Sequence, residues 1–239
     1  MNESAAIIMP VYNEGGAIAG VLEQWIAMLD AQPNLVYRLH VYNDGSKDDT
    51  GRILASLQTR YPRQLIVHAK ANSGHGPTIL HGYRENAPTV DWLFQTDSDG
   101  EIGPENFPSV WRKRAAFDFL IGRRRGRAAP LSRQLVSLVS RITVRVCFGA
   151  GVYDVNCPFR LMRAAVVGPL LPMIPGETFA PNVILAGMAC RLRWRIHEEP
   201  VTFRGRTTGE VSIKKWKLCK AAAKSFFQTV AAARTVRRR

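Results

Sequence analysis

The stretch that decides the fold is Trp92-Leu93-Phe94-Gln95-Thr96-Asp97-Ser98-Asp99-Gly100-Glu101, an apolar run that ends in three acidic side chains at alternate positions. The apolar part predicts a buried strand. Carboxylates spaced in this way beyond a strand end can converge on one point, where like charges need a cation between them. Mg²⁺ or Mn²⁺ suits such hard oxygen ligands and keeps positions for a substrate's phosphates. The same pattern also occurs in solvated acidic turns, so the motif alone leaves both interpretations open.

Strand-like and helix-like segments alternate on both sides of this motif. Strands are expected at 6–12, 36–42, 65–68, 92–95 and 117–121, and helices at 17–29, 48–60 and 77–86. This order predicts an α/β fold with a mainly parallel sheet covered by helices. Ligands of such sheets bind at the carboxyl ends of the strands. Asn13-Glu14, Asn43-Asp44 and Asp97 follow the first, second and fourth strands, where that rule requires a site.

The composition bounds the class of protein. With 239 residues and 46% hydrophobic residues, the chain can bury the core of one domain with an appendage. Its first residues do not resemble a signal peptide, and no apolar run reaches the length of a membrane span. The four cysteines are far apart and favour free thiols in a reducing compartment. We therefore expect a cytoplasmic protein without a transmembrane helix.

The net charge of +14 is concentrated in two segments. Residues 123–145 contain seven arginines and no acid, and residues 211–239 contain nine basic residues and no acid. The rest of the chain is close to neutral. Such patches predict an anionic partner, which is a membrane lipid, a nucleic acid or a phosphorylated substrate.

The pattern changes beyond residue 130. Apolar residues at 131–146 recur on one face of a helix, and either packing on the core or exposure is compatible with that stripe. A second stripe at 213–230 is flanked by lysines and favours a helix on an anionic membrane surface. We expect late strands at 191–197 and 200–203. The predicted organisation is a catalytic domain at 1–212 followed by a basic amphipathic tail at 213–239.

Three more polar turns precede the acidic motif. They are Pro10-Val11-Tyr12-Asn13-Glu14, the segment 41–50 around Asn43-Asp44-Gly45-Ser46, and Ala71-Asn72-Ser73-Gly74-His75-Gly76. In this order the chain resembles the family 2 glycosyltransferases, whose GT-A fold is a Rossmann-like nucleotide-sugar-binding domain. It is most similar to the branch of dolichol-phosphate mannose synthases and bacterial polyprenyl-phosphate glycosyltransferases. The resemblance covers about residues 5–215 and includes the segments 151–154, 158–163 and 206–212.

The resemblance implies a role for each matching residue. Nucleobase and ribose contacts would come from Pro10, Tyr12, Glu14, Asp44, Asn72 and Gly76, with Asp97 near the ribose and the metal. Asp99 would coordinate Mg²⁺ or Mn²⁺ on the diphosphate of a UDP- or GDP-sugar, with Glu101 as a third ligand and Arg206 closing over the phosphates. Glu101 stands where the branch often has glutamine, which leaves its role open.

The resemblance also implies an inverting transfer to an acceptor, and Asp154 is the candidate base or positioning group. A hydroxyl acceptor needs a base, whereas a phosphate monoester is largely dianionic at neutral pH and does not. A turn-forming aspartate is the structural alternative. The lipid-linked acceptor most compatible with the chain is a polyprenyl phosphate, and a hydroxyl of a glycolipid or glycan is the alternative. Arginines 123–125 would hold the acceptor's phosphate or face anionic lipid.

Other classes fit the residues less well. An EF-hand would need glutamate where Pro108 stands. A nucleic-acid-binding protein would interleave aromatics with its basic residues on a sheet, and these segments do not, so no nucleic-acid partner is expected. Arg191-Leu192-Arg193-Trp194 lacks the glutamine of processive synthases, which favours transfer of a single sugar. The expected location is the cytoplasmic face of a membrane, and a homo-oligomer is left open.

Overall fold

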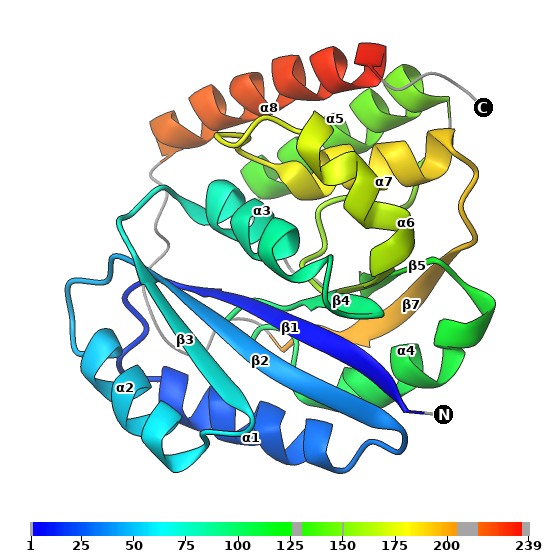
Figure 1. Ribbon diagram of the computed structural model, residues 1–239. Helices are drawn as coiled ribbons and strands as arrows, with labels where there is room; N and C mark the ends of the chain where they lie inside the picture. Colours follow the sequence, from blue (N-terminus) through cyan, green and yellow to red (C-terminus); the bar gives the residue numbers. More distant parts are fainter. Residues whose placement is uncertain (1, 126–130, 150, 205–214, 236–239) are drawn as a thin grey trace.

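The centre of the structure, a computed structural model that describes residues 2–125, 131–149, 151–204 and 215–235, is a seven-stranded mixed sheet of order β3-β2-β1-β4-β6-β5-β7 (Figure 1). The strands are β1 Glu3–Val11, β2 Leu35–Asp44, β3 Leu65–Lys70, β4 Trp92–Gln95, β5 Phe119–Arg125, β6 Arg160–Arg163 and β7 Ile196–Thr202. Strands β3, β2, β1 and β4 are parallel, and β6 runs antiparallel to both β4 and β5. The predicted α/β fold with a mostly parallel sheet is confirmed.

The position of β4 creates the site. The chain adds β2 and then β3 on one side of β1, and it returns to place β4 on the other side of β1. The strand order therefore reverses between β1 and β4. Loops that leave the carboxyl ends of two such strands diverge, which opens a crevice where ligands of α/β sheets bind. The acidic motif at 97–101 directly follows β4.

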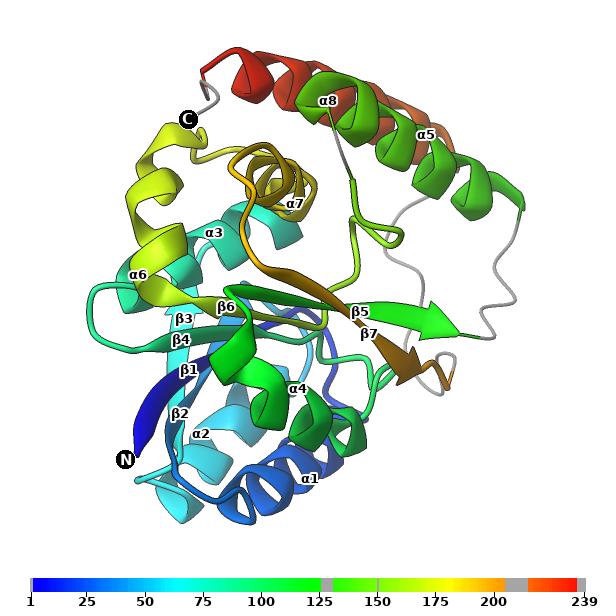
Figure 2. The same cartoon turned by 90° about the vertical axis from the view of Figure 1, so that its right-hand side faces the viewer.

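Helices cover both faces of the sheet (Figures 1 and 2). One face carries α1 Ile18–Asp30, α2 Thr50–Arg60 and α4 Phe107–Lys113. The other carries α3 His75–Asn86, α6 Ala164–Val167 and α7 Pro181–Arg191, with α5 Leu131–Phe148 and α8 Lys215–Thr235 as an outer layer that packs on α7. Short 3₁₀ turns occupy Pro104–Asn106, Arg114–Ala116 and Gly168–Met173.

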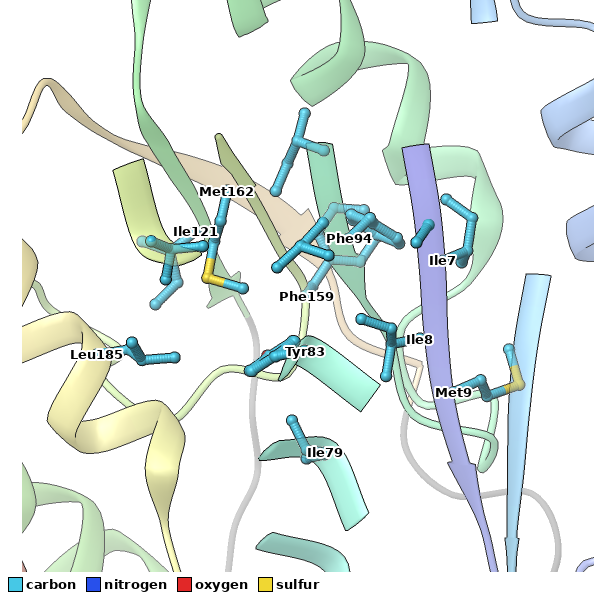
Figure 3. Packing of buried hydrophobic residues seen from close by; sticks show 14 of the residues in the cluster. Ile7, Ile8, Met9, Ile79, Tyr83, Phe94, Ile121, Phe159, Met162 and Leu185 are labelled. Carbon is cyan, nitrogen blue, oxygen red and sulfur yellow. The ribbon is translucent and has the colours of Figure 1, made fainter. Parts of the chain in front are cut away.

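The core fixes β4 from both faces. Figure 3 shows Phe94 of β4 beside Phe159, with Ile79 and Tyr83 of α3 on the opposite side of the strands. The ring of Phe94 makes edge contacts with Phe107 and Phe159 at centroid distances of 4.9 and 4.8 Å. A strand buried on both faces reads as a continuous apolar run, which is why residues 92–94 could be recognised from sequence. This packing holds the start of the acidic loop in place.

The two late strands expected at 191–197 and 200–203 are one strand, β7, so the prediction is confirmed for residues 196–197 and 200–202 and wrong for residues 191–195. Arg191 ends α7, and Arg193 adopts a positive φ of 55° that turns the chain into the single strand β7. Arg191-Leu192-Arg193-Trp194 therefore lies at a helix end and not in a strand. Neither β6 nor α7 was predicted. Helix α7 is buried along nearly all of its length and lacks the amphipathic spacing on which helix prediction relies.

The two outer helices form as predicted, but much apolar surface faces outward. On α5, Ile142 and Val146 are 52% and 77% exposed, whereas Val144 and Phe148 are buried. On α8, Phe227 is 70% exposed, although this helix packs against α5 and α7. The described helices include none with the length and apolar character needed to cross a membrane. The proposed division at residues 212 and 213 stays a prediction.

Candidate active site

The turns after β1 and β2 are tied together by hydrogen bonds. Asn13, with a positive φ of 54°, donates its backbone N–H to the Ser46 hydroxyl at 3.0 Å, and its side-chain oxygen accepts the Lys47 N–H at 2.8 Å. The Gly15 N–H donates to the Asp48 carboxylate at 3.0 Å. These contacts hold the two polar turns side by side at the carboxyl edge of the sheet.

The predicted pocket residues lie on this edge. Pro10 pairs in register with Tyr42 near the end of β1, and Tyr12 and Glu14 follow the strand. The side chain of Glu14 is buried and that of Tyr12 is partly exposed. The structure therefore brings these residues close to the end of β2, where Asp44 lies. Their contacts with a nucleotide stay predictions.

Asp44 organises the loop after β3. Its carboxylate accepts hydrogen bonds from Lys70 Nζ and from the backbone N–H groups of Ser73 and Gly74, the latter two at 2.9 and 2.8 Å. The Asn72 side chain donates to the Asp44 carbonyl at 2.8 Å. Burial opposes ionisation of Asp44, but these donors outweigh it and lower its pKa. This carboxylate is therefore ionised and shapes the loop that was predicted to face the nucleotide.

Gly76 is required by packing within the chain. A Cβ atom on this residue would lie 2.1 Å from the carbonyl oxygen of Phe179 and 2.4 Å from that of Thr178. The start of α3 and the segment before α7 therefore approach each other at a distance that only glycine permits. The close approach gives Gly76 a structural role, and its expected place beside a nucleotide stays a prediction.

Two side chains orient Asp97. His75 Nε2 lies 3.0 Å from Asp97 Oδ1, and Gln95 Nε2 donates to the same oxygen at 3.1 Å. Burial alone would lower the pKa of His75, but the Asp97 carboxylate raises it. Burial alone would raise the pKa of Asp97, and the neighbouring imidazole outweighs it and lowers that pKa. Each member of the pair therefore favours the charged form of the other.

Gln95 is itself held by a buried network. Its Oε1 accepts hydrogen bonds from Tyr83 of α3 at 3.0 Å and from Asn182 of α7 at 2.8 Å. Tyr83, Gln95 and Asn182 are almost completely inaccessible to solvent. A fully satisfied buried network fixes its members in one arrangement. Elements on one face of the sheet thus determine the direction of the Asp97 carboxylate.

The acidic side chains line one small hollow with Thr96, Ile102 and Pro158. Asp97, Asp99 and Glu101 all face it, and Asp99 Oδ1 accepts the backbone N–H of Glu101 at 3.1 Å. Within the described residues, no group of three or more histidine, cysteine or acidic side chains is arranged to hold a metal by itself. The oxygen donors nevertheless fit Mg²⁺ or Mn²⁺, because these ions are commonly held by one or two carboxylates together with substrate phosphates.

Asp154 forms a bidentate ion pair. Its two carboxylate oxygens accept hydrogen bonds from Arg124 Nε at 2.7 Å and from Arg124 Nη2 at 2.8 Å. The turn that carries Asp154 is held by Arg160, whose fully buried guanidinium donates to the carbonyls of Val155 and Cys157 and to that of Asn182 in α7. A charge-assisted fork of this kind is strong and directional. It makes Asp154 a fixed group.

Arg206 lies outside the described residues, as do Gly209 and Ser212. The described chain leads up to this segment beside the acidic loop, because the Arg204 N–H donates to the Glu101 carbonyl at 2.9 Å. The role of Arg206 stays a prediction.

Sequence reasoning missed several residues that shape the site: Lys70, His75, Gln95, Arg124 as the partner of Asp154, Arg160 and Asn182. One signal was present. Gln95 ends a run that is otherwise apolar, and a buried amide needs partners. The partners themselves could not be found, because Asn182 is distant in sequence and lies in a helix that was not predicted.

The sheet, its switch point and the acidic loop define a glycosyltransferase of the GT-A fold. The chain matches Glycosyl transferase family 2 over residues 6–166, well over half of its length, and it belongs to that family. The recognition made from the motifs is confirmed.

Relatives within the family act on lipid phosphates. The undecaprenyl-phosphate mannosyltransferase of Micrococcus luteus is 28% identical over 210 residues, which span 85% of this chain and 84% of the relative. The undecaprenyl-phosphate 4-deoxy-4-formamido-L-arabinose transferase of Photorhabdus laumondii is 26% identical over 191 residues, which span 79% of this chain. The match spans only 57% of that second relative's length.

Solved structures share the fold. Glucosyl-3-phosphoglycerate synthase from Mycobacterium tuberculosis, crystallised with Mn²⁺, UDP and glucosyl-3-phosphoglycerate, superposes with a TM-score of 0.69 at 15% identity. The similarity covers 97% of this chain and 80% of that one. S. aureus TarS residues 1–349, crystallised with UDP, gives a TM-score of 0.59 at 18% identity, covering 98% of this chain and 73% of that one.

Proposed function

We propose that this glycosyltransferase moves one sugar from a nucleoside diphosphate donor to a polyprenyl phosphate with inversion at the anomeric carbon. One observation carries the proposal: Asp97 and Asp99 line a hollow directly after β4, at the switch point of the sheet. Relatives that use undecaprenyl phosphate match most of the chain and support the choice of acceptor.

Asp99 and Asp97 would hold Mg²⁺ or Mn²⁺, and Glu101 lines the same hollow as a further ligand. The bound ion would supply Lewis acidity to the leaving diphosphate. The chain's own residues prepare the site. His75 and Gln95 hold Asp97 in one orientation, and Asp44 shapes the loop that would cover the nucleotide. Pro10, Tyr12, Glu14 and Asn72 would contact the nucleobase and ribose, and Arg206 would meet the phosphates.

Asp154 acts in this proposal as a positioning group. Arg124 engages both of its oxygens, and this fork fixes the carboxylate in one orientation toward β5. A polyprenyl phosphate does not require a base, because its second pKa lies near ~6 and it is largely dianionic at neutral pH. The ion pair thus favours a phosphate over a hydroxyl acceptor. A membrane-bound acceptor also places the protein at an anionic membrane surface.

Ligand binding and transfer test the proposal together. Thermal stability is measured with UDP, GDP and their sugars, with and without Mn²⁺ or Mg²⁺, for the wild type and for Asp99→Asn. Metal-dependent stabilisation by one nucleotide is expected in the wild type and not in the variant. Labelled sugar is then offered to undecaprenyl phosphate and to a glycolipid with a free hydroxyl. Transfer to the hydroxyl alone, or no nucleotide binding at all, would overturn the proposal.

A further inference from the structure

Two arginines stack on one exposed aromatic ring. The guanidinium carbon of Arg123, on β5, lies 4.1 Å from the centroid of the Tyr153 ring, and that of Arg141, on α5, lies 4.8 Å from it. Tyr153 is 53% exposed and Arg123 is also exposed. Segments distant in the sequence thus bring two like charges to the same side chain at the surface. We call Arg123, Tyr153 and Arg141 the arginine clamp.

The arginine clamp holds two positive charges at one ring. Among the residues that the structure describes, no carboxylate forms an ion pair with Arg123 or Arg141, whereas Arg124, the next residue of β5, is paired with Asp154. The acid in contact with the clamp is Glu198, and it accepts the backbone N–H of Tyr153 at 2.8 Å. A cation–π contact offsets only part of the repulsion between two guanidinium groups. An oxyanion between them would satisfy both.

The guanidinium fork specifies the kind of anion. Its paired N–H groups match the oxygens of a phosphate, and arginine is accordingly preferred over lysine where planar recognition of phosphate matters. Stacking on Tyr153 restricts the directions in which the two forks point. The two guanidinium groups held at one ring therefore suit the oxygens of a phosphate.

The surroundings specify the molecule that carries the phosphate. Arg141 lies on α5 between Leu138 and Ile142, which are 41% and 52% exposed, and Val146 is one turn further on. Helix α8 packs beside α5 (Figure 2). Its Phe227 side chain is exposed. Exposed apolar side chains on a helix with basic neighbours and no acid are typical of a surface that inserts into the headgroup layer of a membrane.

We propose that the arginine clamp binds the phosphate of an anionic membrane phospholipid while the apolar residues of α5 enter the bilayer interface. The inference rests on the proposed function only in placing the protein at the membrane of its acceptor. The clamp lies one residue away from both members of the Arg124–Asp154 pair, on β5 and in the turn. Docking there would present the active site to the membrane.

Vesicle binding tests the clamp directly. Cosedimentation is measured with vesicles of phosphatidylcholine alone and of phosphatidylcholine with one quarter phosphatidylglycerol. Arg123→Gln/Arg141→Gln should weaken binding to the anionic vesicles roughly 10- to 30-fold, as expected for about 1 kcal/mol per basic residue near the surface. The charge-matched control Arg38→Gln/Arg63→Gln, at exposed positions on β2 and before β3, should change it about 2-fold or less.

A second variant separates phosphate recognition from diffuse attraction. Arg123→Lys/Arg141→Lys keeps both charges and removes both forks, so binding should still fall about 3- to 10-fold. The proposal would be overturned if this variant bound anionic vesicles with wild-type affinity. It would also be overturned if the glutamine variant and its control lost vesicle affinity equally.

The phosphate of the acceptor is the other phosphate that the clamp could bind. With detergent-solubilised undecaprenyl phosphate and no vesicles, the glutamine variant should keep the wild-type KM for the acceptor. A raised KM with unchanged vesicle binding would show that the clamp binds the phosphate of the acceptor, and it would overturn the proposal that the clamp binds a phospholipid. If the wild type binds vesicles through the clamp and transfers no sugar, only the proposed function fails.

Discussion

Arg124 and Asp154 are joined by two hydrogen bonds of 2.7 and 2.8 Å, and the two side chains are only 8% and 13% exposed. The pair links β5 to the turn that precedes β6. Because the two charges are largely removed from water, burying either charge without its partner would destabilise the protein. The ion pair therefore acts as one unit.

This relationship predicts the outcome of a double-mutant cycle. Asp154→Asn and Arg124→Gln should each lower kcat/KM about 10- to 100-fold. The kcat/KM of the double variant should be no lower than that of the less active single variant, because the effects of changing the two members of one ion pair are not additive. Steady-state kinetics with detergent-solubilised acceptor measure all four proteins. Losses that multiply would show that Asp154 works independently of Arg124, as a base would.

Gln95 should control metal-dependent nucleotide affinity. Gln95→Glu keeps the shape of the side chain, removes the Nε2 donor to Asp97 and adds a like charge beside it. Side chains that orient a metal ligand typically contribute 10- to 100-fold to affinity. We expect the dissociation constant of the nucleotide with Mn²⁺, measured by calorimetry, to rise about that much.

Tyr83→Phe is the matched control for Gln95. It removes the hydrogen bonds of the tyrosine hydroxyl to Gln95 and Asn182, while Asn182 still donates to the same oxygen of Gln95. Stability should fall by about 1 kcal/mol with the nucleotide affinity unchanged. Equal loss of nucleotide affinity in both variants would mean that general loosening, and not the orientation of Asp97, explains the effect.

Gly76 should tolerate no side chain. Gly76→Ala places a methyl group against two backbone carbonyls that cannot move independently, and we expect a loss of about 3 kcal/mol in the free energy of unfolding. Gly20→Ala in α1 meets no atom within 4 Å, so it should stabilise the helix by about 0.5–1 kcal/mol. Urea denaturation of both variants measures the contrast. A neutral Gly76→Ala would contradict the close approach of α3 to residues 178–179.

Glu199 should make the free energy of unfolding depend on pH in the acidic range. Burial opposes its ionisation, but Lys113, Ser109 and His197 donate to it and lower its pKa to about 2. The unfolded chain takes up this proton near the ordinary pKa of 4.5, before the folded chain does. The contribution of ionised Glu199 is therefore complete above pH 4.5 and is lost as the pH falls toward 2.

Comparison with Glu199→Gln isolates this contribution. At pH 7 the wild type should be more stable than Glu199→Gln by on the order of 2 kcal/mol. This is less than the whole pKa shift of Glu199 would give, because Lys113 is partly exposed and solvent weakens its ion pair. The difference should shrink from pH 4.5 to 3.5 in chemical denaturation. A difference that stays constant over this range would show that the pKa of Glu199 is not lowered.

Local pattern was sufficient for the first half of the fold. The runs at 6–12 and 92–95 became β1 and β4, because strands buried on both faces are apolar nearly throughout, and the run at 36–42 became β2, whose second half is buried. It was insufficient further on. Strand β6 is only four residues long and pairs antiparallel with β4 and β5, and α7 is apolar on every side. Neither element therefore shows the hydrophobic periodicity from which a strand or a helix is predicted.

The sequence by itself determined the class of fold and the edge of the sheet where the site lies. The alternation of strands and helices specifies a mainly parallel sheet, and the polar residues at 13–14, 43–46 and 97–101 lie at or just beyond the ends of its strands. Only the tertiary structure decided how those residues are used. Asp44 holds a loop, Asp97 pairs with His75, Asp154 pairs with Arg124, and the apolar stripe of α5 faces outward. Hydrogen bonds and ion pairs depend on distances between atoms to within a few tenths of an ångström, and segments far apart in the chain acquire such distances only when the core packs.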